Sequence, residues 1–167
     1  MSLCPETVPY GRVVALTRDQ VEQCRHEADL WFEESYASNR KCRIPTEVDF
    51  DRLAKRSGRC GEVAAAIVYH LEHDFRIMAF GKPDIGKNTQ VRNGTKLHHR
   101  LYVWKEEPDD EIFVLTRCRY PDLRVWVVGH IRGSRAKNPK WFMSVKKGNE
   151  PAYFVPDHAL IKAPTSL

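Results

Sequence analysis

The spacing of apolar residues changes at about residue 70, and this change constrains the fold more than any other feature of the sequence. Up to that point apolar residues recur every three or four positions, which is the period of an amphipathic helix. Beyond it they gather in short runs that are rich in β-branched and aromatic residues and are separated by turn-forming residues. Helices followed by strands predict an α/β (α+β) fold, in which N-terminal helices pack on a mixed central β-sheet.

Helix signals divide the first part of the chain into three expected helices, which cover residues 17–37, 46–56 and 61–69. Residues 17–20, Thr-Arg-Asp-Gln, form a capping box, in which a hydroxyl and an amide satisfy free backbone groups at a helix start. Gly58 is expected to end the second helix. Residues 63–69 are apolar on nearly every side, so the third helix is expected to be buried against the sheet.

Five strands are expected in the second part of the chain. They cover residues 75–80, 89–92, 100–104, 112–116 and 125–128. Asn93-Gly94 is the strongest turn signal between them, because this pair favours the tight turn of a hairpin. The tail contains two aromatic pairs, Trp141-Phe142 and Tyr153-Phe154, and is expected to cover an edge of the sheet.

The length of 167 residues predicts a single domain. We expect an extended segment over residues 1–16, a helical region over 17–57 and a core over 58–160. No apolar run approaches the ~20 residues needed to span a bilayer, which argues against a membrane protein. The first residues lack the basic stretch and apolar run of a signal peptide, and the five cysteines are widely spread without a C-x-x-C pair. We therefore expect a cytoplasmic protein without a disulfide framework.

Several polar residues lie where the pattern predicts buried elements. Glu62 stands in the apolar helix, where a free acid needs a partner. Asp84 follows the first expected strand, and Gln90-Val91-Arg92 comes six residues later. Because side chains alternate along a strand, Gln90 and Arg92 should leave one face while Val91 points into the core. We expect these oxygen donors and this cation to meet at one sheet edge, where the oxygens suit a hard ion such as Mg²⁺.

At these residues the sequence resembles the PD-(D/E)XK nuclease superfamily, whose signature is a helix Glu, then Pro-Asp, then an acid, any residue and Lys. Here the counterparts are Glu62, Asp84 after Pro83, and Gln90-Val91-Arg92. The resemblance implies a restriction-endonuclease-like core, and the later strands are similar to those of uncharacterised phage and bacterial members. It implies Mg²⁺, with Mn²⁺ as a substitute, held by Glu62, Asp84 and the backbone carbonyl of Val91.

The chain departs from that signature at two positions. Gln90 replaces an acid, so it becomes a weak third ligand or a group that positions water. Arg92 replaces Lys and cannot act as a general base, because a guanidinium stays protonated, but it can clamp a phosphate. The resemblance therefore implies either a metal-dependent endo- or exonuclease, with DNA preferred over RNA as substrate, or a protein of this fold that binds nucleic acid without cutting it.

A different enzyme class remains open at Cys60. The segment Gly58-Arg-Cys-Gly-Glu62 resembles the corresponding segment of transglutaminase-like peptide N-glycanases. If Cys60 lies at a helix start, the helix dipole lowers its thiol pKa and makes it a nucleophile, with His99 and Asp110 as stand-ins for the other catalytic groups. In the plainest interpretation, Cys60 is a small buried residue and Glu62 caps its own helix.

The net charge of +5 is modest, but acidic and basic residues are segregated along the sequence. Basic stretches flank the proposed site, and acids collect elsewhere, so the basic residues are expected to border one polyanionic ligand. The residues expected there are Arg52, Lys55, Arg56, Arg59, Lys82, Lys87 and Lys96, of which Arg56, Arg59, Lys82, Lys87 and Lys96 are the candidate contacts to nucleic acid. The oligomeric state stays open, with a homodimer as one arrangement.

Overall fold

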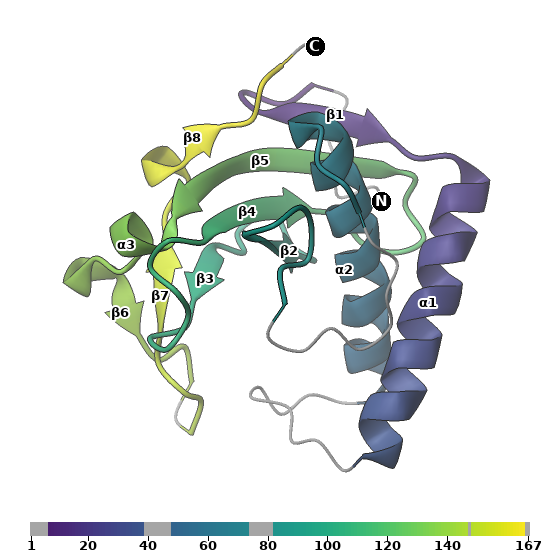
Figure 1. Ribbon diagram of the computed structural model, residues 1–167, viewed down its shortest axis with the longest axis horizontal. Helices are drawn as coiled ribbons and strands as arrows, with labels where there is room; N and C mark the ends of the chain where they lie inside the picture. Colours follow the sequence, from purple (N-terminus) through teal and green to yellow (C-terminus); the bar gives the residue numbers. More distant parts are fainter. Residues whose placement is uncertain (1–6, 39–47, 74–81, 147, 166–167) are drawn as a thin grey trace.

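The computed structural model describes residues 7–38, 48–73, 82–146 and 148–165 and shows a mixed α+β fold (Figure 1). The helices are α1 (Arg18–Ala37), α2 (Val48–Tyr69) and the short α3 (Gly133–Ala136). The strands are β1 (Arg12–Ala15), β2 (Thr89–Gly94), β3 (Leu101–Val103), β4 (Ile112–Arg117), β5 (Arg124–Arg132), β6 (Phe142–Met143), β7 (Ala152–Val155) and β8 (Ile161–Lys162).

The strands form two sheets. The main sheet has the order β1-β5-β4-β2, and β8 also pairs with the long β5. It is mixed, because β2 and β4 are parallel while β1, β4 and β8 each pair with β5 in the antiparallel sense. The second sheet, β3-β7-β6, is antiparallel. The central strands β4 and β5 are therefore covered on both faces and read as nearly continuous apolar runs.

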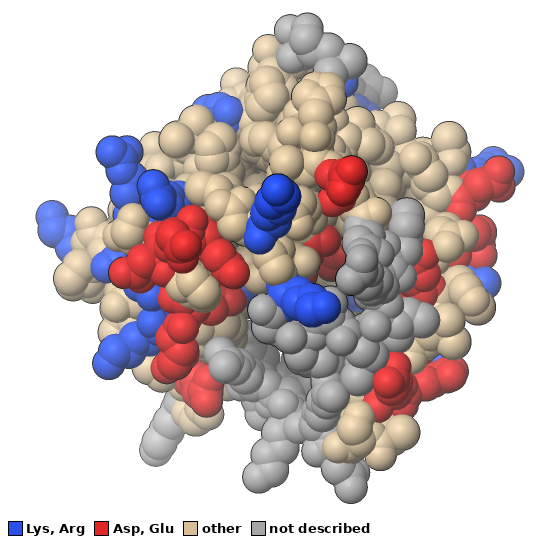
Figure 2. All heavy atoms as spheres, in the orientation of Figure 1, with Lys and Arg blue, Asp and Glu red and all other residues tan. Residues whose placement is uncertain are grey.

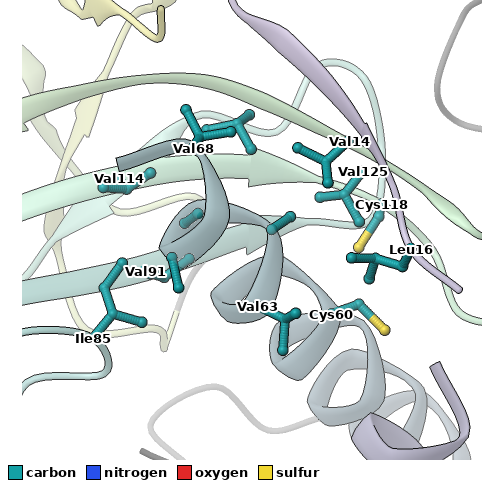
Figure 3. Packing of buried hydrophobic residues seen from close by; sticks show 14 of the residues in the cluster. Val14, Leu16, Cys60, Val63, Val68, Ile85, Val91, Val114, Cys118 and Val125 are labelled. Atoms are coloured by element: carbon teal, nitrogen blue, oxygen red, sulfur yellow. The ribbon is translucent and has the colours of Figure 1, made fainter. Parts of the chain in front are cut away.

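Alternation along β4 and β5 divides the buried residues between two cores. Val114 and Val127 face the two long helices, and together with Val14, Val63 and Val91 they belong to the core shown in Figure 3. Their neighbours in sequence point the other way, into a second core that the main sheet shares with β3 and β7. The layers are thus helices, main sheet and second sheet (Figure 1).

The first expected helix is confirmed together with its cap. The hydroxyl oxygen of Thr17 accepts a hydrogen bond from the backbone N–H of Gln20 at 3.1 Å. In return, the backbone N–H of Thr17 donates to the side-chain oxygen of Gln20 at 2.8 Å. This reciprocal pair satisfies two backbone donors that a helix start would otherwise leave free.

The second and third expected helices are one helix, so the expected break at Gly58 is wrong. α2 runs without interruption from Val48 to Tyr69, and the expected boundary between residues 57 and 58 lies inside it. A Cβ atom at Gly61 would lie 2.3 Å from the hydroxyl oxygen of Thr116 on β4. The glycine therefore allows α2 to approach the sheet closely. Packing of this helix outweighs the cost of about 1 kcal/mol for each interior glycine.

Replacing Gly61 with Ala should destabilise the protein by about 1–3 kcal/mol, because the added methyl group has no room against Thr116. Gly58→Ala is the matched control. A Cβ at Gly58 meets nothing within 4 Å, so this variant should gain about 0.5–1 kcal/mol from higher helix propensity. Urea unfolding of both variants measures the difference. Equal stabilities would contradict the close helix–sheet contact.

Four expected strands are confirmed as β2 to β5, and the expected strand at residues 75–80 lies outside the described residues. The hairpin turn at Asn93-Gly94 is wrong, because both residues belong to β2, which pairs with β4 in parallel. The Asn93 side chain donates to the backbone carbonyl of Cys118 at 3.1 Å. A Cβ at Gly94 would lie 2.7 Å from the Cβ of His99. These residues serve close packing of β2 and not a turn.

The two ends of the described chain do more than the sequence predicts. The segment expected to be merely extended contains β1, which pairs with β5 over Arg12 to Ala15. The tail does not cover an edge of the sheet; β6 and β7 join β3 in the second sheet. Both corrections concern pairing between distant segments, which no local pattern specifies. In the part of the chain that the structure describes, no helix combines the length and apolarity needed to cross a membrane.

Candidate functional site

The close approach of α2 to the main sheet brings Glu62 near Asp84. Gly61 packs on Thr116, and the next residue along the helix is Glu62. Asp84 lies in the tight turn that leads into β2, where its backbone N–H donates to the carbonyl of Thr89 at 2.9 Å. The two carboxylates are close enough that the charge of Glu62 raises the pKa of Asp84.

The carboxylate of Asp84 is held from one side by the backbone of β2. Its Oδ2 atom accepts a hydrogen bond from the N–H of Val91 at 2.7 Å. Burial and the charge of Glu62 raise the pKa of Asp84 to about 6, although the Val91 N–H and two nearby arginines act in the opposite direction. Asp84 is therefore a partly buried acid whose charged form lacks full compensation.

Glu62 is in the middle of α2 and does not cap a helix. Its Oε2 atom accepts from Nη1 of Arg59 at 2.5 Å and lies 3.1 Å from Nε2 of His73. Arg59 also reaches Glu27 on α1, with 3.4 Å between Nη2 and Oε2. Glu27 is 5% exposed, so its ion pair with Arg59 is buried between α1 and α2. Neither His73 nor Glu27 belongs to a motif, and their contacts with Glu62 and Arg59 join separate parts of the fold, which no local pattern in the sequence specifies.

Arg92 lies beside Asp84 but contacts a different acid. Its Nη2 atom forms an ion pair with Oε1 of Glu107, while its Nη1 atom is 3.8 Å from Oδ2 of Asp84. Nη1 also donates a long bond of 3.4 Å to the carbonyl of Val91, the atom expected to help hold a metal. The guanidinium stacks near the rings of Tyr102 and Phe113, at 5.3 and 5.6 Å from their centroids. Arg92 is therefore a largely buried cation with a fixed position at the site.

Gln90 leaves the same face of β2 as Arg92, as the alternation predicts, while Val91 is buried between them. Its amide nitrogen donates to the backbone carbonyl of Lys82 at 3.4 Å. The side chain also hydrogen-bonds to Glu111, whose pKa is raised by burial despite that bond. Gln90 therefore hydrogen-bonds to Lys82 and Glu111, at the margin of the Glu62 and Asp84 pair.

Arg56 and Arg59, two of the residues expected to border a polyanion, are paired with acids of the two long helices. Nε and Nη2 of Arg56 donate to the two carboxylate oxygens of Asp29 on α1, both at 2.8 Å. These bonds hold the pKa of Asp29 below its ordinary value although burial opposes them. Lys55 pairs with Asp51 at 3.0 Å, and Arg59 is engaged by Glu62 and Glu27. Arg56 and Arg59 thus join α2 to α1, and Lys55 pairs within α2, so acids of the two helices already neutralise these three cations.

Three lysines of the expected set remain at the surface: Lys82, Lys87 and Lys96. Each is exposed and forms no ion pair with another residue of the described part of the chain. In the view of Figure 2, lysine and arginine side chains lie interspersed with acidic ones and form no large basic patch. Any polyanion at this site would therefore meet a few separate lysines.

Cys60 occupies the core and not a helix start. It lies in the middle of α2, is 0% exposed and is surrounded by apolar side chains (Figure 3). A hydrogen bond shared with Cys60, together with burial, raises the pKa of the Cys24 thiol. The imidazole Nδ1 of His99 accepts from the N–H of Thr95 at 3.2 Å. Cys60 is therefore not at a helix start, and a helix dipole does not activate its thiol there.

The chemistry available at the site is that of two neighbouring carboxylates with one fixed guanidinium. Within the described residues, no group of three or more His, Cys, Asp and Glu side chains is placed to hold a metal ion. Glu62 and Asp84 supply two oxygen donors, and further donors would have to be backbone carbonyls, an amide oxygen or water. In comparisons with protein-family models, curated proteins and solved structures, nothing matched this chain.

Proposed function

We propose that this protein is a Mg²⁺-dependent phosphodiesterase that acts on nucleic acid, with DNA as the preferred substrate, and that it has a PD-(D/E)XK type of site on a restriction-endonuclease-like core. The observation that carries the proposal is the convergence of Glu62 and Asp84 beside Arg92. Two carboxylates held close together repel each other, and a divalent cation relieves this repulsion. Oxygen donors of this kind fit Mg²⁺ and its substitute Mn²⁺.

The protein's own groups have separate roles in the proposal. Glu62 and Asp84 would hold the cation, which when bound polarises the scissile phosphate and lowers the pKa of a coordinated water. The Val91 N–H fixes the orientation of Asp84, and Arg59 fixes that of Glu62. Arg92 supplies a positive charge that stabilises the charge developing on the phosphate oxygens in the transition state. Gln90 would turn its amide from Lys82 towards water or the cation.

One observation favours a second function, which is nucleic-acid binding without cleavage. Arg92 cannot accept a proton from water, and its guanidinium is already paired with Glu107. The described residues also offer two clustered carboxylates where three would hold a cation more firmly. A protein that only binds would retain nucleic acid in a strongly salt-dependent manner and release no product.

Cleavage assays on the full chain test the proposal. Single- and double-stranded DNA and RNA are incubated with the protein and Mg²⁺, Mn²⁺ or EDTA. We expect product with either cation and none with EDTA. Glu62→Gln should reduce cleavage about a hundredfold or more. Glu72→Gln is the control, because Glu72 is exposed and lies ten residues away. Cleavage that persists in EDTA or in Glu62→Gln would contradict the proposed site, and binding without product would favour the second function.

Alkylation separates this proposal from a cysteine hydrolase. Treatment of the native protein with iodoacetamide should leave metal-dependent cleavage unchanged, because Cys60 has no exposed surface. Peptide mapping by mass spectrometry measures which cysteines are modified. Modification of Cys60 in step with loss of activity, while EDTA has no effect, would favour the cysteine enzyme instead.

A further inference from the structure

Arg92 stands between two carboxylates at unequal distances. Its Nη2 atom forms an ion pair with Glu107, whereas its Nη1 atom is 3.8 Å from Oδ2 of Asp84. An N–H···O hydrogen bond is usually about 2.7–3.2 Å long, and the 3.8 Å between Nη1 and Oδ2 is well beyond that range, so Arg92 does not neutralise Asp84 through one. The side chain of Arg92 is 15% exposed. Because water screens charges weakly at this burial, the carboxylate that Arg92 contacts is stabilised in its charged form and the other is not.

Glu107 is firmly fixed on its side of the guanidinium. Its Oε2 atom accepts a hydrogen bond from the backbone N–H of Trp104 at 2.7 Å. The loop that carries it is also anchored to the residues after α3, because Nζ of Lys137 donates to the carbonyl of Glu107 and to the carboxylate of Asp109. Glu107 is therefore a preorganised partner, and it is 19% exposed.

The surroundings of Arg92 leave its head group few alternatives. The rings of Tyr102 and Phe113 flank the guanidinium and limit its movement towards or away from β3 and β4. Nε of Arg92 is buried and has no hydrogen-bond partner within the described residues. If Glu107 lost its charge, the nearest remaining carboxylate for Arg92 among the described residues would be Asp84.

We propose that Glu107 is a positioning residue that holds Arg92 away from Asp84, so that Asp84 stays available to a divalent cation and Arg92 faces an anionic oxygen of the substrate. The role in catalysis rests on the proposed function, while the effect on the position of Arg92 does not. Without Glu107, Arg92 pairs with Asp84, and this pair competes with the cation for the same carboxylate. Mutation of a residue that hydrogen-bonds to or orients a metal ligand commonly lowers metal affinity by about 10–100-fold.

Crystal structures of the metal-free parent and of the Glu107→Gln and Glu106→Gln variants test the positional step. Glu106 is the matched control, because it carries the same charge one residue away and is exposed. We expect Nη1 of Arg92 to come within about 3.2 Å of Asp84 in Glu107→Gln and to stay in place in Glu106→Gln. An unmoved guanidinium in Glu107→Gln would overturn the inference, whether or not the protein is a nuclease.

Binding of Mn²⁺, measured by calorimetry without substrate, tests the consequence. Glu107→Gln should weaken binding by about tenfold or more relative to the parent and to Glu106→Gln. In an Arg92→Gln background the same change should have almost no effect, because its cause has been removed. A loss of equal size in both backgrounds would show a merely structural role and overturn the inference. A displaced Arg92 in a protein that binds no Mn²⁺ would uphold the positioning by Glu107 and contradict the proposed function.

Discussion

Replacing Asp84 with Asn is expected to abolish metal-dependent cleavage and to make the metal-free protein more stable. The amide removes one of two carboxylate donors, which should reduce the cleavage rate about a hundredfold or more. The fold should remain, because the side-chain oxygen of Asn can still accept the hydrogen bond from Val91. Activity and stability therefore change in opposite directions, which simple unfolding of the variant cannot reproduce.

The stability gain follows from the pKa of Asp84. Its ordinary value is 3.8, and burial together with the charge of Glu62 raises it to about 6 in the folded protein. The folded state thus binds this proton more tightly than the unfolded state, so the contribution of Asp84 to stability falls as pH rises from about 4 to about 6. Above pH 6 the charged form is a cost, and Asp84→Asn should gain about 1–3 kcal/mol in EDTA at pH 8.

Single-turnover cleavage and urea unfolding at pH 8 measure the two effects. Asp110→Asn is the control, because Asp110 is exposed. This variant should cleave at the rate of the parent, and its free energy of unfolding should lie within about 0.5 kcal/mol of the parent's. A variant at Asp84 that cuts like the parent would remove this residue from the site. A variant that is less stable at pH 8 would contradict the uncompensated charge.

Asp157→Asn is expected to destabilise the protein by about 3 kcal/mol or more, because it leaves a buried guanidinium without its counter-ion. Arg117 on β4 is 3% exposed and donates to both oxygens of Asp157 at 2.8 Å. Tyr10, at the N-terminal side of β1, donates to the same carboxylate at 2.7 Å. The group joins three segments that lie far apart in the sequence, so its loss affects the whole sandwich.

The pH dependence of this difference has a defined sign. Burial by itself raises the pKa of Asp157, but hydrogen bonds from Arg117 and Tyr10 outweigh it, and the pKa lies below its ordinary value of 3.8. A lowered folded-state pKa stabilises the protein above pH 3.8, and this contribution is lost as pH falls through the folded-state pKa. The gap between parent and Asp157→Asn should therefore shrink below about pH 4.

Thermal and urea unfolding at pH 7 and pH 3 provide the measurement for this pair. Asp109→Asn is the matched control, because Asp109 also pairs with a cation, Lys137, but is 69% exposed. An exposed ion pair contributes at most about 1 kcal/mol. If both variants lost the same free energy of unfolding, burial would not be the reason for the contribution of the Arg117 and Asp157 pair.

Local patterns predicted the elements whose cause is local. The capping box at Thr17 places the start of α1, and runs of β-branched residues locate β2 to β5, because hydrogen bonds and side-chain spacing within a few residues suffice there. Glycine shows the limit of such patterns. Gly61 is expected at the start of a separate helix and Gly94 in a turn, but both serve close packing against another element. A glycine looks the same in the sequence whether the fold needs it for a turn, a helix end or a close contact.

The candidate site follows the same division. Strand alternation predicts that Arg92 leaves the exposed face of β2, and the resemblance to the nuclease signature predicts that Glu62 and Asp84 lie nearby; Nη1 of Arg92 is 3.8 Å from Oδ2 of Asp84. The tertiary structure alone decided which cation each acid receives: Arg59 pairs with Glu62, and Arg92 turns to Glu107. Ion pairing depends on distances of a few ångströms between separate elements, and no periodicity encodes those distances.

The charged residues show most clearly what the sequence determines and what only the tertiary structure decides. The sequence determines a net charge of +5 and an uneven distribution of basic residues. Packing of α1 against α2 then places Asp29 against Arg56 and Glu27 against Arg59, which removes these cations from the expected surface. Composition counts charges, but only the fold decides which of them neutralise one another, because electrostatic attraction acts through space and not along the chain.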